Sequence, residues 1–498
     1  MLFRSVNPDV ILTAAEMRAA EEQVIAAGTP VETLMERAGQ GAAAAIWRFA
    51  GPMPALILCG PGNNGGDGYV IARALKARGA DVRVGALAEP ATPAARWARG
   101  RWDGPVEPLA QAAPAPLLID ALFGTGLTRP LAPEAANMLN ALAAGALVRV
   151  AVDLPSGAAT DDGRLLSPVP AFHLTVTFAS LKPAHLLLPA ARHMGRMVVA
   201  DIGIEAESRV HRLTRPRLRA PGPADHKYTR GYVAVLAGEM PGAAALAAAA
   251  AARAGAGYVR LVAPEHVPGL PAAVVQGGAD VETVLADGRV GAILVGPGLG
   301  RSDAARMLLH QALASGRPLV LDADALVVLA EQGLSRLRQA RTPPILTPHA
   351  GEFARLFGED GGSKVEAARN VAAHSGAVLV YKGADTVIAD PDGRAAIAPP
   401  APAWLASAGT GDVLAGVIAA MRASGLGAFA AACAGVWLHG EAARRVGGPL
   451  IADDLLDALS PALASCGHPH PFVPSPSTPL TGVAQDELGP SGEVERRT

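Results

Sequence analysis

The stretch Ala55-Leu-Ile-Leu-Cys-Gly-Pro-Gly-Asn-Asn-Gly-Gly-Asp-Gly68 decides the fold of the first half of the chain. Its first five residues form a short apolar run that is typical of a buried strand, and the pattern predicts that a helix follows from Asp67 to Arg78. Glycines between a strand and a helix leave backbone N–H groups free at the helix N-terminus, where phosphate oxygens bind well. The stretch therefore predicts a site for a phosphorylated ligand.

Residues 60–65 also satisfy the G-x-G-x-x-G pattern of dinucleotide-binding turns, which is a weak signal by itself. Such a site also needs an acidic residue at the end of the second strand, and only Glu89 follows the next apolar run. A plain dinucleotide turn has no need for Asn63, Asn64 and Asp67. These three side chains indicate a hydrogen-bonded group or a cation beside the phosphate. A glycine-rich turn without a ligand is the alternative.

Length, charge and cysteine content limit the classes of function. A chain of 498 residues exceeds a single core and predicts two domains plus a tail. A formal net charge of −2, with acids and bases interspersed, indicates small-molecule partners and neither nucleic acid nor membrane. Three cysteines suggest no disulfide framework, and the chain start lacks the pattern of a signal peptide. We therefore expect a cytoplasmic protein.

Short apolar runs alternate with helix-length segments along most of the chain, a pattern typical of parallel strands that are buried on both faces. An arginine- and proline-rich break at 206–225 separates two such series. We predict two three-layer αβα domains, at 1–215 and 216–466, and a disordered tail at 467–498. The predicted strands are Ala55–Cys59, Val82–Leu87, Leu117–Ala121, Leu147–Val152, Leu174–Phe178 and Met197–Ile202, then Val233–Leu236, Tyr258–Val262, Ala292–Val295, Pro318–Leu321, Ile345–Thr347, Val378–Tyr381 and Val387–Ala389.

Polar residues follow several strands of the first half, and ligands bind at the carboxyl ends of strands in open α/β sheets. Asn64, Asp120 and Ser156 offer oxygen ligands of low total charge, which suit a hard cation, including a monovalent one, better than zinc. The loop Gly124-Thr-Gly-Leu-Thr-Arg-Pro130 supplies a second backbone cradle, in which Arg129 can pair with a phosphate. Asp153 is a candidate for proton transfer, with a turn cap as its structural alternative.

Four motifs of the first half occur in a characteristic order: GPGNNGGDG at 60–68, DALFGTGLTRP at 120–130, DLPSG at 153–157 and Lys182-Pro183. Residues 10–205 thereby resemble the N-terminal domain of the YjeF family, the NAD(P)H-hydrate epimerases, which is Rossmann-like and interconverts the R and S epimers of hydrated NADH and NADPH. The resemblance implies a potassium ion at Asn64, Asp120 and Ser156, and a catalytic role for Asp153. The residues that it assigns to the hydrate are Asn63, Asn64, Gly65, Gly66, Asp67, Gly124, Thr125, Gly126, Leu127, Thr128, Arg129 and Pro130.

The strongest local signal of the second half is Ala408-Gly-Thr-Gly-Asp-Val-Leu-Ala-Gly416, at the start of a predicted helix. Gly409 and Gly411 permit tight turns, and the helix N-terminus stabilises anionic oxygens. Asp412 lies in the first turn, where a carboxylate can take a proton from a hydroxyl as phosphate is transferred to it. A simple stabiliser of the first turn is the alternative for Asp412.

Further polar segments follow other strands of the second half. Lys382-Gly-Ala-Asp-Thr386 can hold nucleotide phosphates, and Gly296-Pro-Gly-Leu-Gly300 and Asp322-Ala-Asp324 end two more predicted strands. His349 ends another strand beside Pro348 and Gly351, a position that favours function over a buried structural histidine. Lysine occurs only five times in the chain, so Lys182, Lys227 and Lys382 are candidates for roles that arginine cannot fill.

The series GEMPGAA (238–244), GPGLG, DADAL, LTPHAGEF, KGADT and AGTGD resembles the ribokinase-like ADP/ATP-dependent NAD(P)H-hydrate dehydratases over residues 222–465. One departure lies at His226-Lys-Tyr-Thr-Arg-Gly231, where the family often has His-Lys-Gly. The resemblance implies that Asp412 deprotonates the C6 hydroxyl of the hydrate for phosphorylation. It assigns the hydrate to Ala243, Gly298, His349 and Asp412, and the adenine nucleotide to Lys382, Gly383, Ala384, Asp385, Thr386 and Gly411.

The two resemblances together predict a bifunctional metabolite-repair enzyme in which epimerisation precedes dehydration. The implied ligands are NADHX or NADPHX, potassium in the first domain, and ADP with magnesium in the second. We also expect a homo-oligomer. A ribokinase-type kinase of a small alcohol and a non-catalytic nucleotide-binding protein are the alternatives, because the GTGD chemistry is shared with kinases.

Overall fold

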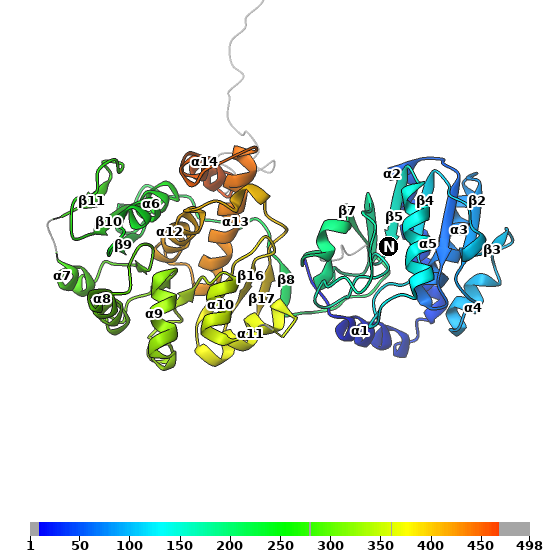
Figure 1. Cartoon of the computed structure of the whole chain (residues 1–498), viewed down its shortest axis with the longest axis horizontal. Helices are drawn as coiled ribbons and strands as arrows, with labels where there is room; N and C mark the ends of the chain where they lie inside the picture. The colour runs from blue at the N-terminus through cyan, green and yellow to red at the C-terminus, as the bar shows by residue number, and fades with distance from the viewer. Residues whose placement is uncertain (1–8, 278–279, 360, 468–498) are drawn as a thin grey trace, which may run out of the picture.

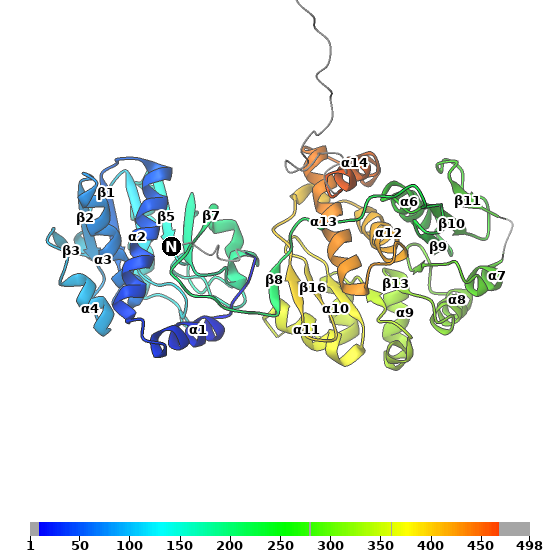
Figure 2. The same cartoon turned by 180° about the vertical axis from the view of Figure 1, so that it is seen from behind.

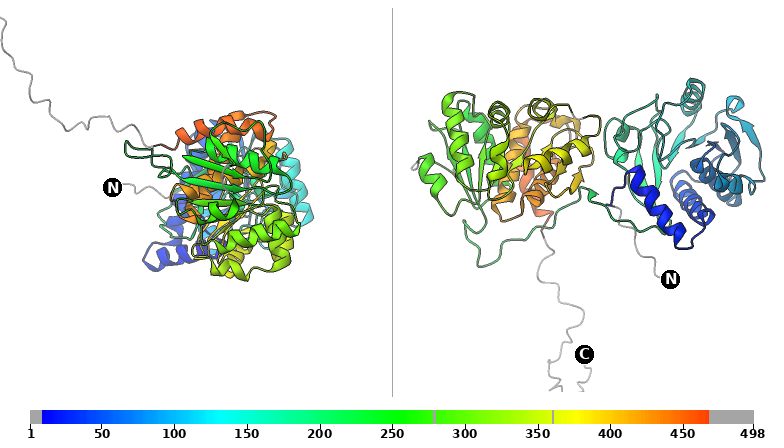
Figure 3. Two further views of the ribbon diagram at one scale, coloured as in Figure 1. Left: turned by 90° about the vertical axis from the view of Figure 1, so that its left-hand side faces the viewer. Right: turned by 90° about the horizontal axis from the view of Figure 1, so that it is seen from below.

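The computed structural model describes residues 9–277, 280–359 and 361–467, which form two lobes that lie side by side (Figures 1 and 3). Each lobe is built on one sheet, and the first sheet has the strand order β3-β2-β1-β4-β5-β6-β7 with parallel pairing throughout. Its strands are β1 (Ala55–Cys59), β2 (Val82–Ala86), β3 (Val106–Pro108), β4 (Leu117–Ala121), β5 (Val148–Val152), β6 (Leu174–Phe178) and β7 (Arg196–Ala200).

Alternate side chains of the first sheet enter two different cores, which makes this lobe three layers thick. Ile57 and Cys59 of β1 pack with the helices on one face, while Leu56 and Leu58 pack with α5 on the other. Figure 1 shows α5 in front of the sheet, and Figure 2 shows α2 and α3 from behind. The helices of this lobe are α1 (Ala14–Ala26), α2 (Val31–Ala50), α3 (Asn63–Ala77), α4 (Pro93–Arg99) and α5 (Pro133–Ala144).

The second sheet has the order β11-β10-β9-β12-β13-β14-β15-β16-β17-β8 among the described residues. Its pairs are parallel except β15 with β16 and β16 with β17, which form an antiparallel extension. Its strands are β8 (Val210–Arg212), β9 (Tyr232–Leu236), β10 (Tyr258–Val262), β11 (Val274–Gln276), β12 (Ala292–Val295), β13 (Leu319–Leu321), β14 (Ile345–Leu346), β15 (Val378–Tyr381), β16 (Val387–Ala389) and β17 (Ala395–Ile397).

Helices cover both faces of the second sheet as well. Val233 and Val235 of β9 face a core shared with α6, α12, α13 and α14, whereas Ala234 and Leu236 face a core shared with α8 to α11. The predicted fold class, two αβα domains of three layers, is therefore confirmed. The helices are α6 (Pro241–Arg253), α7 (Val281–Ala286), α8 (Asp303–Ala314), α9 (Asp324–Gln332), α10 (Ala350–Phe357), α11 (Lys364–Ser375), α12 (Thr410–Ala423), α13 (Ala428–Val446) and α14 (Ala452–Ala464).

The structure differs from the sequence-based expectation at two places that matter for the sites. Helix α3 begins at Asn63 rather than Asp67, because its glycines adopt helical conformation directly after the Gly62 N-cap. The range 206–225, predicted as a linker, contains the short strand β8, which pairs with β17 of the second sheet. The tail beyond residue 467 lies outside the described residues, so the predicted disorder is not tested. No helix within the described ranges is long and apolar enough to cross a membrane.

Candidate functional site

The glycine-rich turn after β1 is held by close backbone packing. A side chain at Gly65 would overlap the carbonyl of Gly60, and a side chain at Gly60 would overlap the carbonyl of Leu122 at the end of β4. Helix α3 follows with Gly62 as its N-cap and without a side chain that caps its first N–H groups. The first turn of α3 therefore presents free backbone donors, as an anion site requires.

Three strand ends of the first sheet converge at Gly124. A Cβ atom built on Gly124 would lie 2.7 Å from Oδ2 of Asp153 and 2.9 Å from Oδ1 of Asn64. Asn64 comes from α3 after β1, Gly124 follows β4, and Asp153 follows β5. The buried Nδ2 atom of Asn64 has no hydrogen-bond partner among the described residues. The structure thus brings the three predicted segments of the first half together.

The carboxylate of Asp153 accepts four hydrogen bonds. Oδ2 accepts from the backbone N–H and the hydroxyl of Thr125, both at 2.6 Å. Oδ1 accepts from the Thr177 hydroxyl and the Lys182 ammonium, both at 2.9 Å. Burial alone would raise the pKa of Asp153, but Lys182 and Thr125 outweigh it and hold the pKa well below its usual range. Asp153 also has a φ of 65°, an unfavourable conformation for a residue with a side chain.

Lys182 is a buried partner that the resemblance did not assign to the site. Its side chain is 2% exposed, and its ammonium donates to the Thr177 hydroxyl at 2.8 Å and to two backbone carbonyls. The neighbouring His185 accepts the backbone N–H of Lys182 at Nδ1, 2.8 Å away, and its Nε2 lies 2.8 Å from the carbonyl of Asp153. Burial lowers the pKa of His185 to about 4, so the ring is neutral and holds the Asp153 backbone.

Asp120 and Ser156, two of the three predicted cation ligands, are in direct contact. The Ser156 hydroxyl lies 2.7 Å from Oδ1 of Asp120, and the Ser156 N–H donates to Oδ2 at 2.9 Å. Asp120 is fully buried, and no basic side chain of the described residues pairs with it. Burial raises the pKa of Asp120 to about 6 against these hydrogen bonds. An unneutralised buried carboxylate beside a hydroxyl fits a bound monovalent cation.

The remaining predicted residues of the first half lie at the rim. Asn63 is exposed, and its Oδ1 accepts from the Thr92 hydroxyl at 2.6 Å. Gly126, Thr128, Arg129 and Pro130 are also exposed, and the Arg129 guanidinium makes no hydrogen bond to another described residue. Gly65 and Gly66 are buried, while Thr125 and Leu127 are half-buried. The loop 124–130 is thus anchored at Thr125 and open to solvent beyond it.

Asp67 lies one helical turn after Asn64 on α3 and is 9% exposed. Burial, with the negative charges of Asp153 and Glu21, raises the pKa of Asp67 well above its usual range. Glu21 comes from α1, and its own pKa is raised by burial and Asp153 against the opposing charges of Lys182 and Arg18. Besides Asp120, three carboxyl groups therefore share the first site, those of Asp67, Glu21 and Asp153, and Lys182 pairs directly only with Asp153.

The second site is centred on the N-terminus of α12. Gly409 is its N-cap in the left-handed region at φ 85°, and no side chain caps the helix. Asp412 lies in the first turn and is half-buried. Burial and the charges of Asp322, Asp324 and Glu352 raise the pKa of Asp412 to about 7, against the opposing charge of Lys382.

Lys382 joins the second site through its side chain. Its ammonium is 2.7 Å from Oδ1 of Asp322 and 3.9 Å from Oε2 of Glu352. A Cβ atom built on Gly411 would lie 3.5 Å from the same ammonium. Burial would lower the pKa of Lys382, but Asp322, Glu352 and Asp412 raise it. The lysine therefore stays charged beside the free N–H groups of α12.

His349 caps a helix at the same edge of the sheet. Its Nδ1 accepts the backbone N–H groups of Gly351 and Glu352 at the start of α10, and its side chain is 60% exposed. Nε2 lies 3.5 Å from Oε1 of Glu352. The structural alternative of a buried histidine does not apply, because the ring faces solvent beside the site.

Gly298 packs against the segment that leads into α6, near Ala243 in the sequence. Gly298 has a φ of 63°, and a side chain there would overlap the carbonyl of Met240, three residues before Ala243. The Met240 N–H donates to the Gly298 carbonyl at 2.9 Å. Gly296 likewise packs directly on the backbone of Asp322, so this loop reaches the Lys382 cluster.

The rest of the loop 382–386 is tied into the fold. The Thr386 hydroxyl donates to the Gly383 carbonyl at 2.8 Å, and the Ala384 carbonyl accepts the N–H of Ala401 at 2.8 Å. The Asp385 carboxylate accepts from Lys364 at 2.7 Å and from the backbone N–H of Leu188, in the first domain, at 2.9 Å. One predicted nucleotide residue therefore joins the two lobes.

Four residues outside the predicted set belong to these sites. The sequence contains features that indicate Lys182 and Asp322 as site residues. Lysine is rare in this chain and Lys182 lies in a motif, and Asp322 follows the end of a strand. Glu352 lies in the same motif as His349, three residues later, but nothing in the motif marks it as a site residue. Glu21 carried no signal, since nothing in the sequence places residue 21 beside residue 153. The third candidate lysine, Lys227, lies over the rings of Tyr228 and Tyr258, away from both sites.

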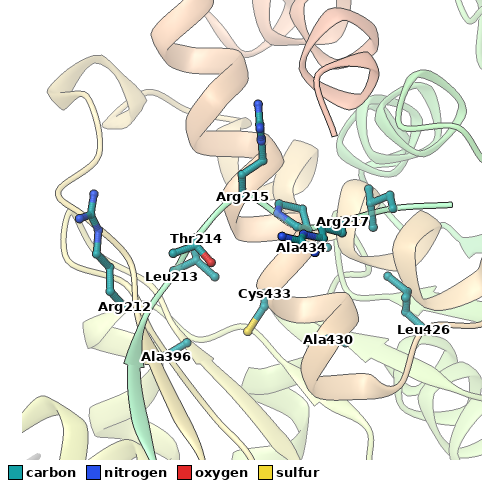
Figure 4. Close-up of a pocket in the computed structure, with 12 residues that line it drawn as sticks. Arg212, Leu213, Thr214, Arg215, Arg217, Ala396, Leu426, Ala430, Cys433 and Ala434 are labelled. Atoms are coloured by element: carbon teal, nitrogen blue, oxygen red, sulfur yellow. The ribbon is translucent and has the colours of Figure 1, made fainter. Parts of the chain in front are cut away.

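A separate cavity of about 470 Å³ lies between residues 212–218, β17 and α13 (Figure 4). Leu213, Leu426 and Cys433 contribute to its lining, and the guanidinium groups of Arg212 and Arg215 lie well apart at its rim. None of its lining residues belongs to the predicted sites.

Fold and sites together define a two-domain α/β protein, Rossmann-like and then ribokinase-like, with an uncapped helix N-terminus and a lysine–aspartate pair in each domain. A family model described as YjeF-related protein N-terminus matches residues 31–184, and one described as NAD(P)H-hydrate dehydratase matches residues 233–460. The chain belongs to the family of bifunctional NAD(P)H-hydrate repair enzymes.

Relatives of this family match both lobes in one chain. The bifunctional NAD(P)H-hydrate repair enzyme of Mycobacterium tuberculosis is 39% identical over 428 residues, which cover 82% of this chain and 88% of that protein. The enzyme of the same name from Salinibacter ruber is 36% identical over 90% of this chain and 95% of its own length. The ADP/ATP-dependent NAD(P)H-hydrate dehydratase of Bacillus subtilis, co-crystallised with ATP and Mg²⁺, is 33% identical over 50% of this chain and 95% of that chain, with a TM-score of 0.43.

Proposed function

We propose that the chain repairs hydrated nicotinamide cofactors in two steps. The first domain interconverts the R and S epimers of NADHX and NADPHX. The second domain dehydrates the S epimer to NADH or NADPH while ADP becomes AMP and phosphate. The observation that carries this proposal is the match of single repair enzymes to both lobes at 36–39% identity, which favours it over a small-molecule kinase.

In the second domain, Asp412 is the base of the proposed reaction. With a pKa of about 7, its carboxylate is available near neutral pH and is basic enough to take the proton of the C6 hydroxyl. The N–H groups at the start of α12 and the Lys382 ammonium stabilise the phosphate oxygens during transfer. Asp322 and Glu352, the carboxylates beside Lys382, are oxygen donors of the kind that would hold magnesium, whose charge would offset that of the phosphates when it binds with ADP.

In the first domain, the substrate's phosphates bind the N–H groups at the start of α3 and the loop 124–130. Arg129 is free to pair with them at the rim. We assign potassium to Asn64, Asp120 and Ser156, because the Asp120 carboxylate is buried without a basic partner among the described residues, and the side-chain oxygens of Asn64 and Ser156 are neutral ligands for a hard cation. Its contribution is a fixed positive charge beside the substrate.

The test of the proposed function is to incubate the protein with an R and S mixture of NADHX, ADP, magnesium and potassium. We expect absorbance of reduced nicotinamide to rise until both epimers are consumed, with one AMP formed for each NADH. Absence of NADH formation would contradict the proposal. Replacement of potassium by lithium should slow the loss of the R epimer and leave the S epimer reaction unchanged.

Location and assembly stay predictions. Cys59, Cys433 and Cys466 are free thiols, which fits a reducing cytoplasm. Light scattering on a size-exclusion column measures whether the chain forms the expected homo-oligomer.

A further inference from the structure

The first site needs a proton donor, and that need follows from the proposed function. A carbon that bears both a hydroxyl group and the ring nitrogen can epimerise by loss and return of the hydroxyl group, and hydroxide is a poor leaving group unless its oxygen is protonated. Asp153 and its partners were the obvious candidates for this proton.

The hydrogen bonds of Asp153 and Lys182 exclude both as donors. All four acceptor positions of the Asp153 carboxylate are filled by Thr125, Thr177 and Lys182, so it carries no proton. The Lys182 ammonium has three protons and four acceptors within 3.2 Å, and it is 2% exposed. The pair is a fixed internal salt bridge that positions the Thr125 loop.

His185 and Arg129 are excluded for different reasons. His185 accepts at Nδ1 and directs Nε2 at the carbonyl of Asp153, so both ring nitrogens are engaged with the backbone. Arg129 is a guanidinium, which does not release a proton in proteins.

Asp67 differs from these groups in its hydrogen bonding and in the charges around it. Its carboxyl group is 9% exposed and makes no hydrogen bond to another described residue. It lies three residues after Asn64 on α3, and this spacing places both on the helix face that meets Gly124 and Asp153. The groups that face it are the carboxylates of Asp153 and Glu21 and the buried thiol of Cys59, with no cation among them. This surrounding raises the pKa of Asp67 well above its usual range and so favours its protonated form.

We propose that Asp67 is the catalytic acid of the first site. Asp67 gives its proton to the hydroxyl oxygen of the hydrate, the C6–O electron pair leaves as water, and the lone pair of the ring nitrogen forms the C=N bond. Water that adds to the other face of the cation releases a proton, which restores the acid. The two aspartates thus have different roles. Asp153 is a fixed negative charge that stabilises the cation, and Asp67 donates and regains the proton.

Glu21 is the competing donor. It is the third carboxyl group of the site, but its side chain is more exposed than that of Asp67, and Arg18 and Lys182 lower its pKa. Charge from these two basic groups favours the ionised form of Glu21. Asp67 receives no such compensation, and this difference decides between them.

The experiment measures the loss of the R epimer for full-length Asp67→Asn, Glu21→Gln and Asp161→Asn. A separate dehydratase without an epimerase domain is added in excess, and the control holds that dehydratase alone. We expect Asp67→Asn to lower kcat by about 10²-fold or more with little change in KM. We expect the wild-type rate to fall at high pH and the variant to lose that limb. Asp161→Asn is the matched control, because Asp161 is another aspartate of this domain with a raised pKa, and it holds the N–H of Ala14.

Two outcomes would overturn the inference: an Asp67→Asn protein that keeps wild-type kcat and its high-pH limb, or a larger loss in Glu21→Gln than in Asp67→Asn. An inactive wild-type protein would instead refute the proposed function. Circular dichroism and the unchanged dehydration of the S epimer show that the Asp67→Asn protein is folded.

Discussion

The two domains place the same pair of residue types, an aspartate and a buried lysine, at the carboxyl edge of a parallel sheet, with opposite electrostatic results. In the first domain Lys182 binds Asp153 directly at 2.9 Å and holds its pKa low. In the second domain Lys382 binds Asp322 at 2.7 Å instead, and the pKa of Asp412 rises to about 7. The partner to which each lysine binds therefore decides whether the pKa of the aspartate at this edge is lowered, as at Asp153, or raised, as at Asp412.

Removal of the Asp412 carboxylate should give the largest effect. Asp412→Asn removes the base, and we expect kcat for dehydration of the S epimer to fall by about 10²- to 10⁴-fold while epimerisation continues. NADH formation and epimer ratio, followed in the same sample, separate the two activities. Asp453→Asn is the control, since Asp453 also occupies the first turn of a helix, α14, but is exposed. Parallel loss of both activities would show that the sites are not separate.

The second largest effect is expected from loss of the Lys182–Asp153 salt bridge in the first domain. Lys182→Met leaves the buried Asp153 carboxylate without its cation, and we expect unfolding free energy to fall by about 3 to 5 kcal/mol. Urea denaturation measures this loss. Lys76→Met serves as the control, because Lys76 is 45% exposed and solvent screens its ion pair with Asp103, so little stability is lost. Equal stability of the two variants would mean that Asp153 needs no counter-charge.

The same contrast shows what the sequence could predict. Apolar runs and glycine turns predicted the layers, the central strands and the strand ends that carry the sites, because those features are local. The strands β3, β8, β11 and β17 were missed, since the first three contain polar residues or proline and β17 is mainly alanine. None of them shows the run of branched apolar residues that predicted the equally short β13 and β16. Choice of partner was also out of reach: nothing local indicates that Lys382 binds Asp322, sixty residues away, rather than Asp412.

The pH dependence of dehydration tests whether the pKa of Asp412 is raised, in contrast to that of Asp153. Asp412 loses its function as a base when it is protonated, so we expect the rate to fall about tenfold for each pH unit below about 7. Asp322→Asn removes a negative neighbour and frees Lys382, and both changes lower the pKa of Asp412. The acid limb should then move about one unit lower, roughly 1.4 kcal/mol.

Asp324→Asn is the control for that shift, because Asp324 raises the pKa of Asp412 less than Asp322 does. His439, the histidine that faces Lys382 from α13, has a pKa of about 4 because it is buried, so it stays neutral across this range. An acid limb that stays near pH 7 in Asp322→Asn would contradict the electrostatic account of Asp412.

The smallest expected effect concerns the hydrogen bond that links the two sites. Asp385 accepts from Lys364 and from the N–H of Leu188, three residues after His185, so the loop 382–386 is joined to the first domain through this carboxylate. Asp385→Asn keeps the shape but removes the charge, and a charge-assisted hydrogen bond contributes about 1.5 to 3 kcal/mol at most. Because the loop keeps its Thr386 and Ala384 contacts, we expect ADP affinity to fall only about three- to tenfold, measured by calorimetry. Asp103→Asn, at an exposed ion pair of the first domain, should leave it unchanged. Equal ADP affinity in both variants would mean that the second site forms without help from the first domain, and that the two opposite charge arrangements arise independently.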